Sequence, residues 1–428
     1  MNNRTPTKIR NNDKITVFVE QAIFSLYTLL LNVFSARFLS PSDFGIIVFI
    51  NIFLFLSVGI QNSIFFKTLT VKLAREKIYN DRIRYIVNIT IINALYNTIL
   101  NLLIALFISL RFSLSLNSTL IVYVYLLSFN MYETSRRIKI ASESFTSLVI
   151  TTSIRFILFI FSFIFFIINE YVSINLILTL CAISSAIPII SFYFKGFLST
   201  KDYDINARVK EAFVTFKFEW NKSNFIFKKY LTQFFTVQIY PMISGIFFPS
   251  SQLAKFEIFR TCFAPLSVFI NGLNNYYFVV LSKFYVDSKN TFIKKLFSLS
   301  FTYLTIGTVY SVIMYLSFEK IDTLIFEGKY SKNFSSGYLI IVAIFSVCTS
   351  INLLYENYFP IADKNKTSFK ISIYIFVVNI FLLPYLFITF LANGMYLGIF
   401  INQLLILLSY ILVISNFHWK ELALFKNK

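Results

Sequence analysis

The chain has 428 residues, of which 57% are hydrophobic and only 14% are charged. A soluble domain is about 45–50% apolar and about 25% charged, so this composition excludes an ordinary soluble enzyme. The formal net charge of +19 would suggest nucleic-acid binding in a soluble protein. Here the basic residues gather between apolar segments, as they do in the cytoplasmic loops of membrane proteins. We therefore expect an all-α polytopic membrane protein with no nucleic-acid partner.

Apolar runs separated by charged breaks predict twelve transmembrane helices, since a helix needs about 20 apolar residues to cross a bilayer. Residues 1–14 lack an apolar stretch with a cleavage site, which favours a leader rather than a signal peptide. The predicted spans are 15–38, 44–66, 85–110, 118–135, 146–168, 173–194, 229–248, 253–280, 297–318, 334–355, 369–392 and 397–417.

The charge pattern divides these spans and orients them. Thirty-one of the 39 lysines and arginines fall on the side of the two termini, so both termini are expected in the cytoplasm. The longest charged break separates two groups of six spans. The predicted parts are a cytoplasmic leader (1–14), an N-terminal six-helix lobe (15–194), a cytoplasmic connecting loop (195–228), a C-terminal six-helix lobe (229–417) and a cytoplasmic tail (418–428).

Charged residues within the spans are the strongest candidates for a functional site. A charge at the centre of a membrane helix costs roughly 2.5–3.5 kcal/mol on insertion scales, so it should face a partner or a water-filled cavity. Arg155 lies deep in the fifth span and either lines a cavity or forms a structural ion pair. Glu257 and Arg260 are three residues apart on one helix face and can pair. The pair is either structural, or a switch in which Arg260 binds an anionic substrate and Glu257 neutralises it otherwise.

Other polar residues extend the candidate site. Glu20 in the first span could take up a proton in a low dielectric, or it could be hydrated near the cytoplasmic interface. Glu20, Glu257 and Asp43 are the candidates for coupling to protons or sodium ions. Arg37, Asn271 and Asn274 join Arg155 and Arg260 as candidates for a substrate-binding cavity.

The sequence lacks the motifs of several common cofactor sites and catalytic sites. There is no glycine-rich phosphate loop and no His/Cys metal spacing, so we expect no metal and no cofactor. His418 is the single histidine and lies in the tail, which argues against a Ser-His-Asp triad. The longest predicted outer loop is short for an enzyme that must hold a glycan acceptor. These observations favour a transporter over an enzyme.

Two turns echo each other along the chain. Residues 40–45 (Ser-Pro-Ser-Asp-Phe-Gly) enter the second span, and residues 249–254 (Pro-Ser-Ser-Gln-Leu-Ala) enter the eighth. In both, a Pro/Ser turn with a polar N-cap predicts a tight hairpin between helices. Two similar six-helix halves are a known transporter plan with the substrate site between them.

The first hairpin carries a family resemblance. Residues 35–45 (Ser-Ala-Arg-Phe-Leu-Ser-Pro-Ser-Asp-Phe-Gly) match the small-Arg-x-Leu-x-Pro-x-Asp-Phe-Gly pattern of the O-antigen (Wzx-type) polysaccharide flippases. These belong to the multidrug/oligosaccharidyl-lipid/polysaccharide (MOP) exporter superfamily. Weaker matches follow in order at residues 253–256, 325–330, 362–366 and 393–398. Glu327 stands before Gly328 where the family usually has Leu-Phe-Gly.

The resemblance implies a V-shaped bundle of two six-helix lobes in the bacterial inner membrane. Its implied cargo is an undecaprenyl-diphosphate-linked oligosaccharide repeat unit, moved from the cytoplasmic to the periplasmic leaflet by alternating access. The repeat unit would belong to an O-antigen, a capsule or a similar surface polysaccharide. Arg260 matches by position a basic residue of the related lipid II flippases. Implied partners are membrane lipids, a polysaccharide polymerase and a chain-length regulator.

Two alternatives remain. A cation-coupled multidrug exporter of the same superfamily would need acidic residues facing an organic cation, whereas the deep charges here include two arginines, Arg155 and Arg260. A membrane polymerase or ligase for the same glycans is the third reading. The sequence leaves open the sugar composition of the cargo, the coupling ion and the oligomeric state.

Overall fold

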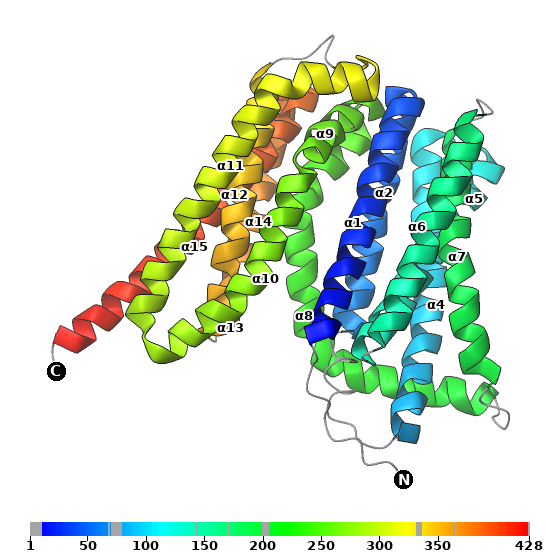
Figure 1. The fold of residues 1–428 in the computed structure, drawn as a ribbon, viewed down its shortest axis with the longest axis horizontal. Helices are drawn as coiled ribbons and strands as arrows, with labels where there is room; N and C mark the ends of the chain where they lie inside the picture. The colour runs from blue at the N-terminus through cyan, green and yellow to red at the C-terminus, as the bar shows by residue number, and fades with distance from the viewer. Residues whose placement is uncertain are drawn as a thin grey trace. The chain divides into compact units, whose positions relative to one another are not determined.

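The computed structural model describes residues 11–66, 69, 79–142, 144–168, 172–198, 205–330, 336–362 and 364–426. Almost all of these residues are helical (Figure 1). The first ten residues of the predicted leader, residues 199–204 of the connecting loop, Asp363 of a family match and the last two residues of the tail lie outside this set. The helices are α1 (Asn11–Phe38), α2 (Pro41–Gln61) with a π-helical end (Asn62–Phe66), α4 (Tyr79–Phe112), α5 (Leu116–Ala141), α6 (Phe145–Ile168), α7 (Ile174–Leu198), α8 (Ile205–Phe247), α9 (Ser250–Cys262), α10 (Ala264–Asp287), α11 (Lys289–Phe326), α12 (Ser336–Glu356), α13 (Tyr358–Ile361), α14 (Asn365–Phe390) and α15 (Gly394–Lys426).

Each predicted span falls on a helix, which confirms the all-α membrane fold class. The eighth span is broken into α9 and α10 at Phe263, because Pro265 in the first turn of α10 has no N–H to continue the ladder. Within the described residues, seven helical segments are long and apolar enough to cross a membrane by length and composition, one of them covering both α14 and α15. The remaining predicted spans are more polar or shorter.

Two segments predicted outside the membrane spans are helical in the structure. The connecting loop 195–228 is largely helical, since residues 195–198 end α7 and residues 205–228 begin α8. The tail is likewise helical as far as Lys426. Low hydropathy separates both segments from the apolar spans. It indicates that a segment lies outside the membrane, but it does not exclude a helix.

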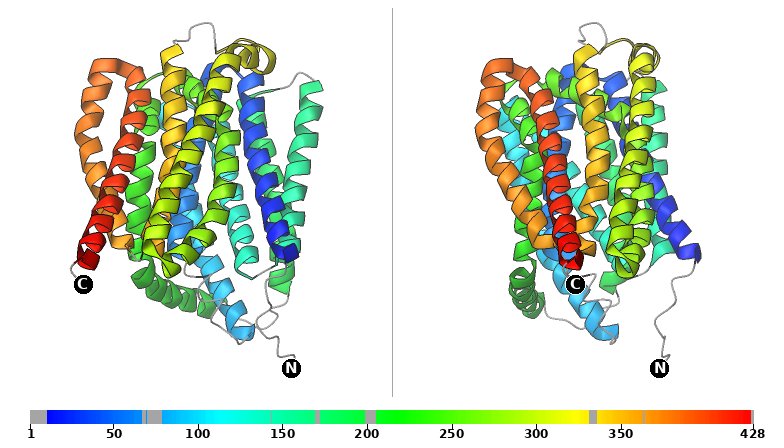
Figure 2. Two further views of the ribbon diagram at one scale, coloured as in Figure 1. Left: turned by 60° about the vertical axis from the view of Figure 1, so that its left-hand side comes forward. Right: turned by 90° about the vertical axis from the view of Figure 1, so that its left-hand side faces the viewer.

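The helices form two compact units. The first contains residues 1–31 and 50–230, and the second contains residues 32–49 and 231–428. In the first unit α5 packs against α4 and α7, and α6 packs against α7. In the second, α12 packs against α11 and α15, and α14 packs against α15. Figure 2 shows these helices from two further directions. The segment 32–49, the tip of the α1–α2 hairpin, groups with the second unit.

The two echoing turns meet in the second unit. Ser40 caps α2, accepting from the Asp43 amide at 3.1 Å and donating to the Asp43 carboxylate at 2.9 Å. Ser250, the first residue of α9, donates from its hydroxyl to the Ser42 carbonyl at 2.9 Å. A Cβ atom on Gly45 would lie 1.8 Å from the Ser250 carbonyl oxygen, so only glycine allows the two helix starts to approach this closely.

Replacing Gly45 with alanine is expected to destabilise the second unit by about 1–3 kcal/mol, because the new methyl group meets backbone that cannot rotate away. The thermal unfolding midpoint of the purified protein measures the effect. Gly272→Ala is the matched control, since a Cβ there meets no described atom within 4 Å. The Gly272 variant should be neutral or slightly more stable. Equal midpoints for the two variants would contradict the packing argument.

Candidate functional site

Arg155 of α6 lies in an aromatic cage in the first unit. Its guanidinium carbon is 3.9 Å from the ring centroid of Tyr27, 4.3 Å from that of Tyr132 and 4.6 Å from that of Phe129. The side chain is 1% exposed, and none of its three nitrogens has a hydrogen-bond partner among the described residues. Arg155 therefore lines no open cavity in this conformation, and no described carboxylate forms an ion pair with it. Aromatic faces stabilise the cation, but they accept no full hydrogen bonds.

A buried ion-pair network lies next to this cage. Arg136 of α5 binds both carboxylate oxygens of Glu20 on α1, at 2.7 and 3.0 Å. The same guanidinium contacts Glu133 at 3.3 Å, and Arg137 contacts Glu133 at 2.6 Å. Glu20 is 1% exposed and Glu133 is 2% exposed. Glu20, predicted as an ion-coupling residue, thus lies in the interior. It forms a bidentate ion pair with Arg136, which was not among the predicted site residues.

The cage and the network are connected through hydroxyl groups. The Thr152 hydroxyl donates to Glu20 at 3.1 Å and lies 2.9 Å from the Tyr132 hydroxyl, whose ring faces Arg155. Together the cluster holds three guanidinium groups and two carboxylates. Arg136 and Arg137 neutralise the carboxylates, so Arg155 is the surplus cation.

Lys139 adds a further cation at the end of α5, outside the predicted span. Its ammonium group donates to the Thr151 hydroxyl on α6, and the residue is 5% exposed. Burial lowers the pKa of Lys139 to about 8. The spacing Glu133, Arg136, Arg137 follows the i,i+3 and i,i+4 pairing rule and was the available sequence signal for this region.

A second cluster lies in the second unit around Glu257. Arg260 donates to the Glu257 carboxylate at 2.9 Å, so the pair expected from their spacing is present. Asn32 donates to the other carboxylate oxygen at 2.9 Å. Glu257 is buried, whereas the Arg260 side chain is 36% exposed. One face of the guanidinium is thus held by the protein while the other can meet a ligand.

The other residues predicted for the substrate-binding cavity lie in the second unit. Arg37 donates to the carbonyls of Leu324 and Ile325 and pairs with Glu327 at 3.6 Å. Asn274 accepts from Asn357 at 2.7 Å, and Asn271 is exposed.

The first-hairpin motif and the 325–330 motif are thus in contact. Lys329 donates to the Arg37 carbonyl, and the Tyr330 hydroxyl donates to the Ala36 carbonyl at 3.2 Å. Glu327 and Gly328 both have positive φ values, 59° and 68°, at the end of α11. The Asp43 carboxylate accepts a hydrogen bond from the Ser40 hydroxyl, and its ion-coupling role stays a prediction.

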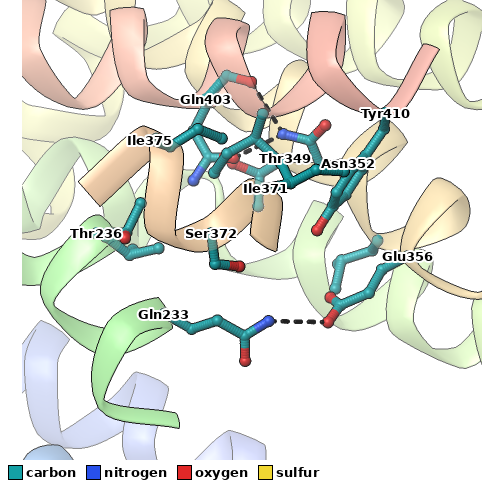
Figure 3. A pocket seen from close by; sticks show the side chains of 13 residues that line it. Gln233, Thr236, Thr349, Asn352, Glu356, Ile371, Ser372, Ile375, Gln403 and Tyr410 are labelled. Atoms are coloured by element: carbon teal, nitrogen blue, oxygen red, sulfur yellow. Dashed lines mark hydrogen bonds between the residues drawn. The ribbon is translucent and has the colours of Figure 1, made fainter. Parts of the chain in front are cut away.

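A cavity of about 250 Å³ within the second unit was not predicted (Figure 3). It lies between α8, α12, α14 and α15. Its one carboxylate is Glu356, which accepts from the Gln233 amide at 3.2 Å. Asn352 is 6% exposed; its NH2 group donates to Gln403 at 2.8 Å, and its Oδ1 has no partner among the described residues. Neither arginine nor lysine lines the cavity.

Three of the hydroxyl groups around this cavity donate away from it. Thr236, Thr349 and Ser372 each donate to the backbone carbonyl one turn earlier in their own helices, which leaves oxygen lone pairs for the cavity. Together with Glu356 and Asn352 Oδ1 these oxygens give the site several hydrogen-bond acceptors, beside the donor groups of Gln233, Gln403 and Tyr410. Oxygen acceptors beside a carboxylate suit a hard cation.

The comparisons with known proteins place the fold. No protein-family model matches the chain, and no curated protein matches it. The solved structure of a lipid II flippase MurJ in an inward closed conformation aligns with 95% of this chain and 88% of its own, at 16% identity and a TM-score of 0.69. An inward-facing multidrug resistance MATE family transporter aligns with 93% of this chain and 98% of its own, at 12% identity and a TM-score of 0.63.

A third structure, a MOP superfamily transporter from Pyrococcus furiosus, has a TM-score of 0.56 at 13% identity, with 94% of each chain covered. The chain has the fold of the MOP-superfamily transporters. This confirms the predicted superfamily fold of a multi-pass membrane protein. Flippases and multidrug transporters share the fold, so the choice between them depends on the charges of the site.

Proposed function

We propose that this protein is a flippase for an undecaprenyl-diphosphate-linked oligosaccharide repeat unit. The observation that supports this is the charge balance of the buried cluster in the first unit. Glu20 and Glu133 are each bound by arginine, whereas Arg155 has no carboxylate partner among the described residues. A membrane protein retains such a cation at a cost of several kcal/mol, which favours a negatively charged cargo.

Arg260 is the arginine that a cargo could reach, since its side chain is 36% exposed. Guanidinium binds phosphate oxygens through two parallel hydrogen bonds, and a diphosphate offers several such oxygens. When no cargo is present, Glu257 satisfies Arg260 at 2.9 Å and Asn32 holds Glu257 in place. Cargo binding would exchange one anionic partner for another, so the Arg260 guanidinium would keep an anionic partner throughout.

Replacing Arg260 with glutamine is expected to weaken binding of undecaprenyl diphosphate roughly 10- to 100-fold, because charge-assisted hydrogen bonds contribute about 1.5–3 kcal/mol. Titration of the purified protein with this lipid, followed by native mass spectrometry, measures the change. Lys255→Gln is the matched control, since it removes a partly exposed cation from the same helix. Equal loss in both variants, or tight binding of lipophilic cations instead of the diphosphate, would contradict the proposal.

The multidrug exporter is the second candidate, and the Glu356 cavity is the observation in its favour. A carboxylate surrounded by oxygen acceptors attracts a cation. The volume of about 250 Å³ is below the range of about 300–1,000 Å³ typical of drug-sized ligands. We therefore assign this cavity to the coupling ion of the flippase rather than to a drug. In this assignment Glu356 replaces Glu20 and Glu257, which are held by arginines.

Replacing Glu356 with glutamine is expected to abolish stabilisation by sodium. The wild-type protein should gain about 1.4 kcal/mol at a sodium concentration ten times the dissociation constant, and the variant should gain nothing. Thermal unfolding in sodium chloride and in choline chloride measures the difference. Glu319→Gln, at an exposed carboxylate of α11, should keep the full sodium effect. A sodium effect that persists in the Glu356 variant would refute this assignment.

The cellular setting completes the proposal. The protein would reside in the bacterial inner membrane with both termini in the cytoplasm, and alternating access would carry the cargo to the periplasmic leaflet. It would act without catalysing a reaction. A polysaccharide polymerase would use the translocated repeat unit, and a chain-length regulator would set the size of the O-antigen, capsule or similar polymer.

A further inference from the structure

The first part of α8, residues 205–229, forms an additional surface element of the first unit. In Figure 1 it runs across the ends of α4 and α7 rather than along them, and Figure 2 shows it at the margin of its unit. It lies at the end where α1 and α4 begin. By sequence this is the end of the helices with most of the lysines and arginines.

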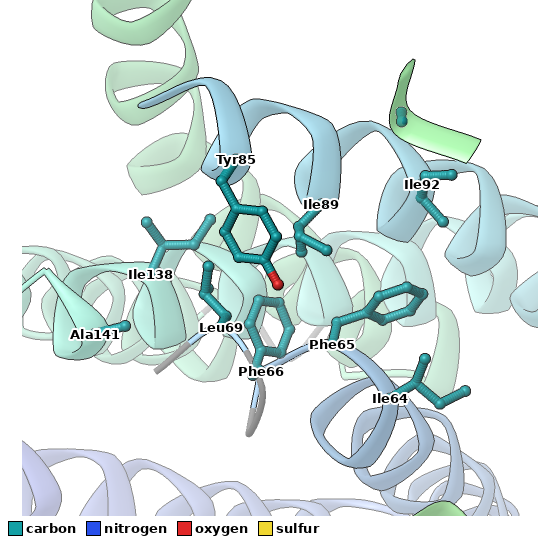
Figure 4. Close-up of a cluster of buried hydrophobic side chains, with 10 residues drawn as sticks. Ile64, Phe65, Phe66, Leu69, Tyr85, Ile89, Ile92, Ile138 and Ala141 are labelled. Carbon is teal, nitrogen blue, oxygen red and sulfur yellow. The ribbon is translucent and has the colours of Figure 1, made fainter. Parts of the chain in front are cut away.

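One face of this segment is anchored to the first unit. Ala212 belongs to a buried apolar cluster that includes Phe65 and Tyr85, which Figure 4 shows. Three aromatic residues of α8 pack against that cluster. The Phe216 ring lies 5.9 Å from the ring of Phe65. At the end of the segment the Tyr230 hydroxyl donates to the Phe55 carbonyl at 2.9 Å. The three aromatic residues are Phe216, Trp220 and Phe227.

Polar contacts fix the same face. Arg84 of α4 pairs with Glu211, and Asn88 donates to the Thr215 hydroxyl at 3.3 Å. The acidic Glu211 is thus neutralised by the protein itself. The orientation of the segment about its own axis is therefore fixed, and the opposite face points away from the unit.

The opposite face alternates lysines with apolar residues at helical spacing. Positions 210, 213, 214 and 217 follow intervals of three and four residues, so they share one side of the helix. Val214 is 71% exposed and Phe213 is 54% exposed. No acidic residue occupies this stripe in the sequence. The stripe consists of Lys210, Phe213, Val214 and Lys217.

This pattern differs from that of a helix face in bulk water. A helix that lies in a membrane interface buries apolar side chains among the acyl chains while lysines reach the headgroups. Each lysine near an anionic bilayer surface is attracted to its headgroups. We propose that the stripe docks on the anionic lipid headgroups of the bilayer and holds α8 in the plane of the interface. This function is separate from cargo binding, because the stripe shares no residue with either polar cluster.

The test reconstitutes the full-length protein into vesicles of phosphatidylcholine, with or without phosphatidylglycerol. The wild-type unfolding midpoint should rise when phosphatidylglycerol is present. The variant Lys210→Gln/Lys217→Gln should lose most of that rise and keep its midpoint in pure phosphatidylcholine. The control Lys366→Gln/Lys370→Gln removes the same charge from α14 and should keep the rise. Equal losses in both double variants would overturn the proposal.

A second measurement locates the stripe directly. Val214→Cys labelled with bimane should be quenched by lipids that carry a spin label near the headgroup, whereas Asn290→Cys, exposed at the start of α11, should be quenched less. The native cysteines of the described chain are buried, so they contribute little label. A bimane at position 214 that is quenched only by water-soluble agents would overturn the proposal and indicate a soluble partner or open solvent.

Discussion

Replacing Arg155 with methionine is expected to abolish transport while leaving the protein as stable as the wild type or more stable. Arg155 is 1% exposed and none of its guanidinium nitrogens has a hydrogen-bond partner among the described residues, so only the aromatic rings compensate its desolvation there. Methionine fits an aromatic cage through sulfur contacts. Replacing a buried charge by an apolar side chain of similar size is often neutral or stabilising by about 1–4 kcal/mol. A residue retained at such a cost is expected to serve the cargo.

Two measurements separate function from stability for Arg155. Restoration of surface polysaccharide in a strain that lacks the protein reports transport, and the thermal midpoint of the purified variant reports stability. Arg111→Met is the control, because Arg111 is partly exposed at the end of α4 and should keep both. If Arg155→Met loses several kcal/mol of stability, or if it supports normal surface polysaccharide, the proposed role of Arg155 is wrong.

Replacing Arg136 with glutamine is expected to destabilise the first unit by about 3–5 kcal/mol. The substitution leaves Glu20 without its bidentate partner, and Glu20 is 1% exposed. An uncompensated buried carboxylate carries the full cost of desolvation. A lysine at this position would restore the charge but not the bidentate geometry, so Arg136→Lys should rescue stability only in part.

Arg137→Gln is the matched control for this prediction, since it removes the same charge one residue further along α5. The Arg137 side chain is 39% exposed and its partner Glu133 keeps Arg136, so the loss should stay below about 1 kcal/mol. Thermal unfolding of both variants in detergent gives the comparison. Similar midpoints for the two variants would contradict the role assigned to the Glu20–Arg136 pair.

The sequence predicted the features that depend on neighbouring residues. Apolar runs located the membrane helices, the Pro/Ser turn at residues 40–45 predicted the hairpin that Ser40 caps, and a spacing of three residues predicted the Glu257–Arg260 pair. Each depends on a rule that acts within one or two helix turns. The family motif added the superfamily fold, which the solved structures bear out.

The remaining features depend on contacts between distant parts of the chain. Arg136 and Glu20 are 116 residues apart, and the cage of Arg155 comes from α1 and α5. The Glu356 cavity needs four helices, none of which is distinctive alone. The start of α8 lies in the predicted connecting loop, because its lysines lower the mean hydropathy although its apolar residues follow helical spacing. Helical periodicity rather than mean hydropathy would have found it.

The most direct test of the central claim is a lipid and surface-glycan analysis of cells from which the gene has been deleted. If the protein is the proposed flippase, lipid-linked single repeat units should accumulate at the cytoplasmic leaflet while the surface polymer disappears. Single repeat units displayed at the surface would point to a polymerase. Normal surface glycan together with altered tolerance to cationic compounds would contradict the flippase and identify a drug exporter.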